Sequence, residues 1–212
     1  MIISKQKDFG YILSAIDGKS VFIVGCAQCA TLCNTGGEKE VLEIKTKLEE
    51  KSLIVTGWTI LDPACHMLND KRILRKYKKE IEKSEKILVL ACGNGSQTVS
   101  DIYEDKDVIS GTDTLFLGEI KHAGVFEKKC DLCGECIVDN FNGLCPVTSC
   151  PKGLLNGPCG GVNNGKCEIS EDIDCVWYQI IEHLKENNKL DKLQKINEPK
   201  NWSKSTIFKM RV

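Results

Sequence analysis

Cysteine is the residue type in this sequence that could do the most chemistry. There are thirteen cysteines in a chain of 212 residues. Cysteine thiolates can pair as disulfides, bind a metal ion or hold an iron–sulfur cluster. Five of the cysteines fall between residues 26 and 92, and eight fall between residues 130 and 175. Their spacing, and the compartment in which the chain works, decide between these chemistries.

The start of the chain indicates a reducing compartment. Residues 1–20 do not follow the basic, then apolar, then small-residue order of a signal peptide. No apolar run approaches the roughly 20 residues that a membrane span needs. The sequence therefore predicts a cytoplasmic protein, in which disulfides are rarely kept. An odd number of cysteines also argues against a disulfide framework, so metal ligation is the favoured interpretation.

The eight cysteines of the second half begin with a tight triple. Cys130, Cys133 and Cys136 have C-x2-C-x2-C spacing, which resembles the start of a bacterial ferredoxin run. Zinc sites more often use separated C-x2-C pairs. Cys145 and Cys150 are each followed by proline, at offsets that differ from those of a simple ferredoxin. We expect two four-thiolate sets, one of which could hold zinc, from Cys130, Cys133, Cys136, Cys145, Cys150, Cys159, Cys167 and Cys175.

The five cysteines of the first half follow apolar runs. Cys26 closes the run VFIVG, and Cys29 and Cys33 come shortly after it. Cys65 follows SLIVTGW, and Cys92 follows KILVLA. If these runs are parallel strands, their carboxyl ends meet at one edge of the sheet, and we expect a metal site there. The alternative is that Cys26 and Cys92 are small buried apolar residues, as free cysteine often is.

The elements that must position these cysteines follow an alternating pattern. Apolar runs at residues 19–25, 52–58, 86–91 and 107–110 are typical of buried strands. Between them, helical patterns are predicted over residues 38–50, 70–83 and 97–104. This alternation predicts an α/β domain over residues 1–122, with a doubly wound parallel sheet of Rossmann or flavodoxin type.

The second half of the chain has a different composition. Residues 130–175 are rich in Cys, Gly, Asn and Pro and show no sustained period. Such a segment cannot bury a core of its own and needs a cofactor to hold it. A helix is predicted over residues 176–190, and residues 196–212 are expected to be extended. We therefore expect an irregular cysteine-rich domain over residues 123–212 that ends in a helix and a tail.

Other candidate chemistry is weaker. His66, beside Cys65, could act as a base for that thiol or as a metal ligand, although a lone histidine is more often neither. The loop CGNGSQT after the third strand resembles a glycine-rich anion cradle, without a full nucleotide motif. A net charge of −1 and the lack of interleaved basic and aromatic residues exclude nucleic acid and membrane surfaces as expected partners.

Two long stretches of the sequence resemble a known family. The segments CDLCGEC, GLCPVTSCPKGLLNGPCGG, GKCE and CVW resemble the methylenetetrahydrofolate reductase C-terminal domain family. Upstream, GCAQCATLCNTGGEKEV, LACGNGSQTV and DTLFLGEI look like the N-terminal half of the same kind of protein. The resemblance covers about residues 15–185 and is closest to the small iron–sulfur companion subunits of acetogen-type methylenetetrahydrofolate reductase.

The resemblance implies ligand roles for the cysteines. Cys26, Cys29 and Cys33 match the N-terminal motif, Cys92 matches the motif after the third strand, and the eight later cysteines match the C-terminal motif. Cys65 fits by position, in a less diagnostic DPACHM context. The implied cofactors are two or three [4Fe–4S] clusters, with zinc at one site as the alternative.

The resemblance also implies a function. The chain is too short to hold a (β/α)8 barrel beside its own domains, so the flavin and the folate would bind to a separate barrel subunit. This chain would then be a non-catalytic subunit that passes electrons from a redox donor such as ferredoxin to that flavin, in one-carbon metabolism. One alternative is a metal-stapled docking subunit without a redox role. Another is an independent enzyme with an open metal site in its first half.

Overall fold

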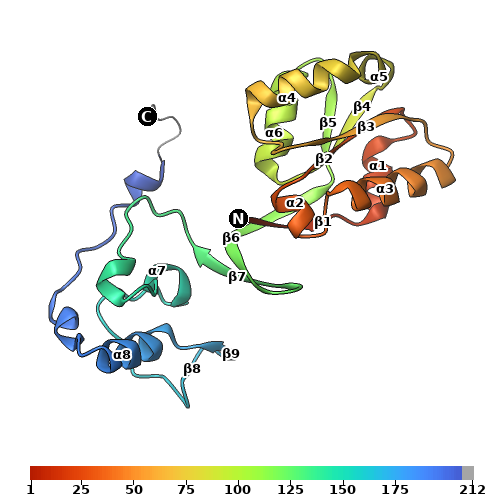
Figure 1. The fold of residues 1–212 in the computed structure, drawn as a ribbon. Coiled ribbons are helices and arrows are strands. Elements are labelled where there is room, and N and C mark those ends of the chain that lie inside the picture. The colour runs from red at the N-terminus through yellow and green to blue at the C-terminus, as the bar shows by residue number, and fades with distance from the viewer. Residues whose placement is uncertain (207–212) are drawn as a thin grey trace. The chain divides into compact units, whose positions relative to one another are not determined.

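The computed structural model describes residues 1–206 and divides the chain into two compact units. The first unit is Met1–Phe116, and the second begins at Leu117 (Figure 1). No helix in the described residues combines the length and the apolar character needed to cross a bilayer. Each unit is considered by itself below.

A parallel four-stranded sheet forms the centre of the first unit. Its strands are β2 (Val21–Cys26), β3 (Val55–Leu61), β4 (Lys86–Leu90) and β5 (Asp107–Ser110), in the order β3-β2-β4-β5. All three neighbouring pairs are parallel. The predicted α/β class with a parallel sheet is confirmed.

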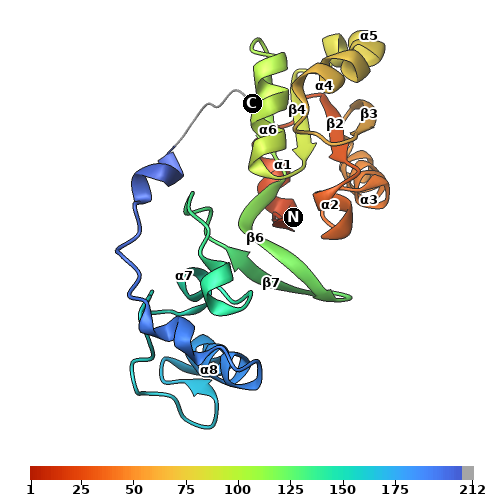
Figure 2. The same ribbon diagram turned by 60° about the vertical axis from the view of Figure 1, so that its left-hand side comes forward.

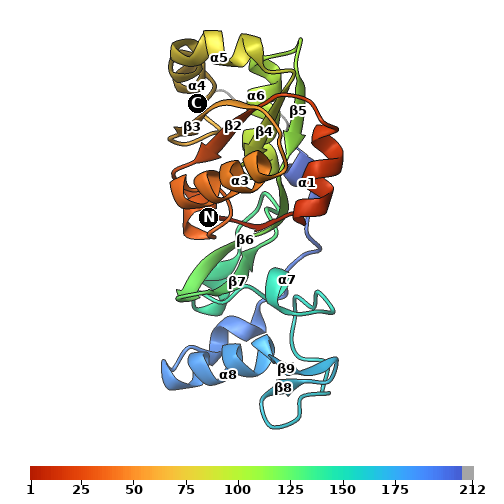
Figure 3. The same cartoon turned by 90° about the vertical axis from the view of Figure 1, so that its right-hand side faces the viewer.

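Helices cover both faces of this sheet. On one face lie α1 (Phe9–Ile16) and α3 (Glu38–Glu50), whose apolar residues share a core with the sheet. On the other face lie α4 (Met67–Leu74), α5 (Lys78–Lys83) and α6 (Gly93–Ile102). Figures 2 and 3 show α3 and α6 on opposite sides of the strands.

The sequence of β2 explains why both faces are covered. Every residue from Val21 to Cys26 is buried. Val21 and Ile23 pack toward α1 and α3, whereas Phe22 and Val24 pack toward α4, α5 and α6. Each such side chain contributes roughly 1.5–3 kcal/mol to folding when fully buried, so a central strand apolar on both faces requires helices on both.

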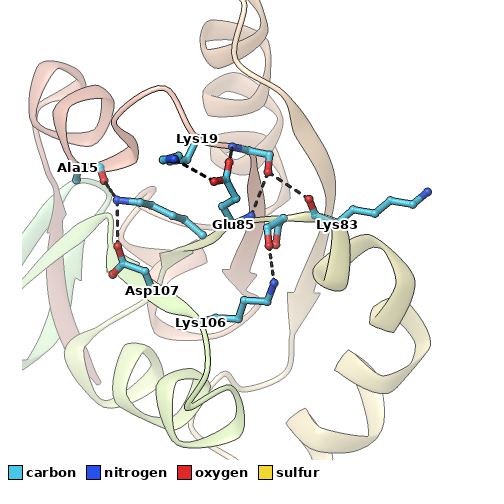
Figure 4. A network of polar contacts seen from close by, with 9 residues as sticks. Ala15, Lys19, Lys83, Glu85, Lys106 and Asp107 are labelled. Atoms are coloured by element: carbon cyan, nitrogen blue, oxygen red, sulfur yellow. Dashed lines mark hydrogen bonds and ion pairs between the residues drawn. The ribbon is translucent and has the colours of Figure 1, made fainter.

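Polar contacts hold the amino ends of the strands (Figure 4). Glu85, just before β4, forms an ion pair of 3.1 Å with Lys19, just before β2. Lys86 lies 3.0 Å from the carboxylate of Asp107 in β5 and donates to the carbonyl of Ala15 at 2.8 Å. This edge of the sheet is therefore built from charge pairs, and the five cysteines of the unit lie at or after the opposite, carboxyl ends of β2, β3 and β4.

Several predicted boundaries differ from the structure. The strand predicted at 52–58 runs from Val55 to Leu61, because Ser52 adopts a left-handed conformation (φ 60°) where α3 ends. The single helix predicted at 70–83 is α4, a 3₁₀ turn η1 (Arg75–Tyr77) and α5. The helix predicted at 97–104 begins earlier, at Gly93, so the glycine-rich stretch forms its first turn.

A second sheet and the first helix, α1, were not anticipated. A second sheet has the order β1-β6-β7, with β1 (Ile2–Gln6), β6 (Thr112–His122) and β7 (Val125–Cys130). β6 begins in the first unit and ends in the second, where it pairs antiparallel with β7. Charged residues interrupt the apolar alternation of this hairpin, and α1 is only eight residues long.

The second unit consists of short elements around one longer helix. They are η2 (Val138–Phe141), α7 (Pro146–Ser149), β8 (Lys166–Cys167), β9 (Ser170–Asp174), α8 (Val176–Glu186), η3 (Leu190–Gln194) and η4 (Trp202–Thr206). The predicted C-terminal helix is confirmed, although it ends four residues early. The tail was predicted to be extended, but residues 202–206 form a 3₁₀ turn, and residues 207–212 lie outside the described part.

The core of the second unit is small. Its buried residues are Phe141, Val176, Trp177, Ile180 and Leu184. Four of the five belong to α8, and only Phe141 comes from the cysteine-rich segment. The rings of Phe141 and Trp177 meet edge to face, 5.3 Å apart. The segment 130–175 contributes one buried residue to this core, together with partly buried side chains such as Leu144 and Leu154 that pack against it.

Candidate metal centre

Three strands of the first unit deliver thiols to one edge of the sheet. Cys26 is the last residue of β2, and its partner in β3 is Leu61, four residues before Cys65. Gly25 pairs with Leu90, the last residue of β4, two residues before Cys92. The strands thus end at the same level, as the sequence predicted.

The loop after β2 is packed closely against β4. It contains α2 (Cys29–Leu32) and returns so that the Cys26 N–H donates to the Gly36 carbonyl at 2.8 Å. A methyl group at Gly36 would overlap the carbonyl of Leu90. Glycine is needed here because the backbones approach so closely, and this approach fixes Cys29 beside the strand ends.

Three thiols of the first unit act electrostatically on Cys65. Burial raises the pKa of Cys65, and the charges of Cys92, Cys26 and Cys29 raise it further. These three charges disfavour the ionised form of Cys65, so a positive charge at this edge of the sheet would favour its thiolate. A metal ion or an iron–sulfur cluster supplies that charge, and the donor set fits either in its chemistry.

Cys33 points elsewhere. Its side chain is buried, and its Sγ lies 3.8 Å from the carbonyl of Ile2 in β1. The structure thus brings together Cys26, Cys29, Cys65 and Cys92 and leaves Cys33 outside the group.

Asp70 is a site residue that the sequence reasoning missed. This aspartate on α4 is fully buried, and its charge also raises the pKa of Cys65. Its Oδ2 accepts the backbone N–H of His66 at 3.1 Å, whereas its Oδ1 has no hydrogen-bond partner among the described residues. Burial raises the pKa of Asp70 above its ordinary value. A lone aspartate in the first turn of a helix gives no sequence signal beyond ordinary capping.

The other candidates have structural roles in this unit. His66 is the N-cap of α4, and its Nδ1 accepts the N–H of Asn69 at 3.3 Å. This contact gives no support to a base or ligand role. In the predicted anion cradle, the Gly93 N–H donates to Thr114 Oγ1 at 2.7 Å, so that donor is already used.

In the second unit, the tight triple and one further cysteine line a cavity. Cys130, Cys133, Cys136 and Cys145 surround a space of about 350 Å³ whose walls also include apolar side chains such as Ile137. The backbone N–H of Leu132 donates to Cys130 Sγ at 3.3 Å. Four thiols around an apolar hollow, one of them accepting a backbone N–H, are typical of the environment of iron–sulfur clusters in proteins.

The tail of the chain lies against this thiol loop. Gly134 has a φ of 76°, and a side chain there would meet the backbone of Lys204. Lys204 Nζ lies 2.7 Å from Glu135 Oε1, and Lys200 Nζ donates to the Glu135 carbonyl. Two lysines therefore hold the tail at the loop that carries Cys133 and Cys136.

The structure does not gather the other four cysteines into one cavity. Cys150 and Cys175 pack at the edge of the small core. Cys159 Sγ lies 3.7 Å from Glu168 Oε1, and the backbone N–H of Gly161 lowers its pKa. Cys167 lies in β8. A second four-thiolate set in this unit stays a prediction.

The thiol groups are too open for a single ion. In residues 1–206, no three His, Cys, Asp or Glu side chains lie close enough together to hold one metal ion. Zinc takes thiolates at about 2.3 Å, which places their sulfurs roughly 4 Å from one another. All thirteen cysteines are free.

Comparison with known proteins assigns part of the chain. Residues 109–203 match the family model described as "Methylene-tetrahydrofolate reductase C terminal". No curated protein and no solved structure has a significant match to the chain. The match confirms the resemblance for this region, which contains the eight later cysteines, and it does not reach the four-thiol group of the first unit.

Proposed function

We propose that this chain is the iron–sulfur electron-transfer subunit of a methylenetetrahydrofolate reductase complex. Its clusters would pass electrons from a redox carrier to the flavin of a separate barrel subunit that reduces the folate. The observation that carries the proposal is the convergence of four thiols at the carboxyl edge of the sheet, Cys26, Cys29, Cys65 and Cys92.

The geometry of the thiols favours clusters. The charges of Cys26, Cys29 and Cys92 act on Cys65, yet within residues 1–206 no three such side chains lie close enough together to hold one ion. A [4Fe–4S] cluster is larger than a single ion, and each of its four irons binds one thiolate. The thiols around a cluster therefore lie farther apart than those around one metal ion. The cavity around Cys130 has the same donor set and an apolar lining. These two sets would hold two clusters, and a third centre, of iron or zinc, would need Cys150, Cys159, Cys167 and Cys175.

Metal analysis of protein kept from oxygen tests this proposal. We expect iron and acid-labile sulfide for at least two clusters per chain, and an absorption band that bleaches on reduction and recovers on reoxidation. A colourless protein that contains only zinc would contradict the electron-transfer role.

A pair of substitutions tests the assignment within the first unit. Cys65→Ser should remove about four irons per chain, because it breaks a four-thiolate set. Cys33→Ser is the matched control, since its thiol faces the Ile2 carbonyl, and it should keep the full iron content. Loss of iron in the Cys33 variant, with none in the Cys65 variant, would show that the group has been assigned to the wrong cysteines.

A docking role without redox chemistry is the second candidate. It is favoured by the small core of the second unit, which has five buried residues, so that metals would be needed to hold its loops. Metals that hold the fold but do not change oxidation state under physiological reductants would support this candidate over the first.

A further inference from the structure

A concentrated basic surface lies on α4, η1 and α5. Between residues 71 and 79, six of nine residues are basic and none is acidic. The chain as a whole carries a net charge of −1, so this stretch is a local departure from its average. All six side chains are exposed, and we call them the basic surface: Lys71, Arg72, Arg75, Lys76, Lys78 and Lys79.

Most of these charges have no structural use in the first unit. Lys78 lies 3.5 Å from Glu82, and Arg72 donates to the amide oxygen of Asn69 at 2.8 Å. The other four have no carboxylate partner within residues 1–206. Cations in the last turn of α4 stabilise the helix dipole, which accounts for Lys71 and Arg72 but not for the rest.

The basic surface surrounds a hollow. A space of about 340 Å³ is lined by Lys71, Arg75 and Lys78 on one side and by Ile102 and Tyr103, at the end of α6, on the other. Burial raises the pKa of Tyr103, so its phenol keeps its proton and can donate a hydrogen bond. Three cations and a phenol around a hollow suit a carboxylate from a partner.

The same helices begin at the thiols. α4 begins at Met67, two residues after Cys65, and α6 begins at Gly93, directly after Cys92. The two helices contact each other, and the hollow lies at their far ends. α6 has ten residues, so the hollow is about 15 Å from the four-thiol group along the helix axis.

We propose that the basic surface docks the acidic face of a small protein redox carrier. On docking, the reduced carrier would lose one electron, and the centre held by the four thiols would gain it; no bond is made or broken and no proton moves. This inference rests on the proposed function for the electron step, whereas the docking itself depends only on the basic surface.

A protein fits this surface better than a nucleic acid. Single-stranded nucleic acids need exposed rings for stacking, but Tyr77, the ring within the basic stretch, is half-buried with its centroid 5.8 Å from that of Phe22. The charges also extend over three helical segments, which suits a face rather than one small anion. Opposite charge on a partner would steer its approach and orient it.

Binding of an acidic carrier to the full-length, metal-loaded chain tests the proposal. The probe is a bacterial two-cluster ferredoxin with a net negative charge, labelled for fluorescence anisotropy. The variant Lys71→Gln/Arg75→Gln/Lys76→Gln removes three charges from the basic surface. The control Lys39→Gln/Lys47→Gln/Lys51→Gln removes three charges from α3 and its C-cap, which belong to the opposite face of the sheet.

We expect the basic-surface variant to bind the probe at least about tenfold more weakly at low salt, and the control variant to bind within twofold of the native chain. The difference should shrink as salt is raised, because exposed charges are screened. Equal weakening in both variants would overturn the proposal, since only net charge would then matter. Selective binding of single-stranded RNA in place of the probe would also overturn it.

Metal content separates this test from the test of the proposed function. A chain that lacks redox-active clusters but still binds the probe through the basic surface would keep the docking site and refute the electron step. Conversely, the chain could have two redox-active clusters and bind the probe equally well with and without the basic-surface substitutions. That result would refute the docking site and keep the proposed function. Circular dichroism checks that both triple variants are folded.

Discussion

Asp70 is the residue through which the protein could tune the proposed centre of the first unit. It is buried, one of its carboxylate oxygens has no partner among the described residues, and its charge acts on Cys65. A negative charge near an iron–sulfur cluster opposes the addition of an electron and lowers the reduction potential. We expect Asp70→Asn to raise the midpoint potential of this centre, as measured by a redox titration followed by electron paramagnetic resonance.

The matched control is Asp101→Asn, an exposed aspartate on α6. This variant should leave the potential unchanged because its charge is in solvent. The pKa of Asp70 is raised, so the native carboxylate gains a proton as pH falls through that pKa and loses its charge. The native potential should therefore approach that of Asp70→Asn at low pH and depart from it at high pH. Identical potentials for all three proteins would exclude a tuning role.

The sequence shows thirteen cysteines, but it does not show which of them belong to the same site. Cys33 faces the carbonyl of Ile2 because of the direction in which the short helix α2 leaves β2. The spacing of the cysteines in the sequence does not fix that direction. Asp70 was missed for a related reason, because only burial distinguishes it from an ordinary residue of the first helical turn. The basic surface corresponds to a run of basic residues in the sequence. Its position relative to the thiols is known only from the contact between α4 and α6.

At the scale of the element, the loop between β2 and α3 depends on close backbone packing at Gly36. We expect Gly36→Ala to lower the free energy of unfolding by roughly 1–3 kcal/mol, since the new methyl group forces the loop away from the Leu90 carbonyl. It should also lower the iron content of the first unit, because Cys29 moves with the loop.

Gly93→Ala is the control for this substitution. Its methyl group would meet only Thr114 Oγ1, at 3.3 Å, in the first turn of α6. Urea unfolding and iron analysis of both variants provide the measurement. Equal stability and equal iron content in the two would show that the loop adapts and that the close approach is not required.

The ion pair before β4 gives an element-scale prediction about pH. Lys19, with help from the Ser20 N–H, lowers the pKa of Glu85 below its ordinary value. A carboxyl group with a lowered folded-state pKa stabilises the fold above its unfolded pKa and loses that contribution as pH falls through the folded pKa. Glu85→Gln should therefore lower the urea midpoint slightly at pH 7 and leave it unchanged near pH 3. Glu50→Gln, at an exposed end of α3, should have no effect at either pH.

The elements predicted best are those with the strongest burial. The strands of the parallel sheet were found because buried parallel strands are continuous apolar runs. β1 and the hairpin of β6 and β7 were missed because they are short or alternate with charged residues. The break at η1 was missed because the basic residues around it all favour helix, so propensity gave no sign of a 3₁₀ turn there.

At the scale of the whole molecule, the two units differ in how much apolar core they contain. The first unit has two clusters of buried residues on the two faces of its sheet, whereas the second has one cluster of five. Metal removal should therefore unfold the second unit selectively, because thiolate–metal bonds would provide much of its folding free energy.

Limited proteolysis of the metal-loaded and metal-free chain tests this difference. We expect chelation to open cleavage sites within residues 130–175 while residues 1–116 stay protected, and mass spectrometry of the fragments would locate the cuts. Equal protection of both units after complete metal loss would show that the short elements hold without metal. Equal loss of protection would show that the sheet domain also depends on its centre.

The charge pairs at the amino ends of the strands leave one edge of the sheet domain without thiols (Figure 4). The turn at Asp17 and Gly18 lies beside them, and both residues are exposed. This turn is therefore a suitable point for attaching a tether. A tether attached at Asp17 would fix the sheet domain to an electrode by the edge that carries no cysteine and would leave its thiol edge free for a redox partner.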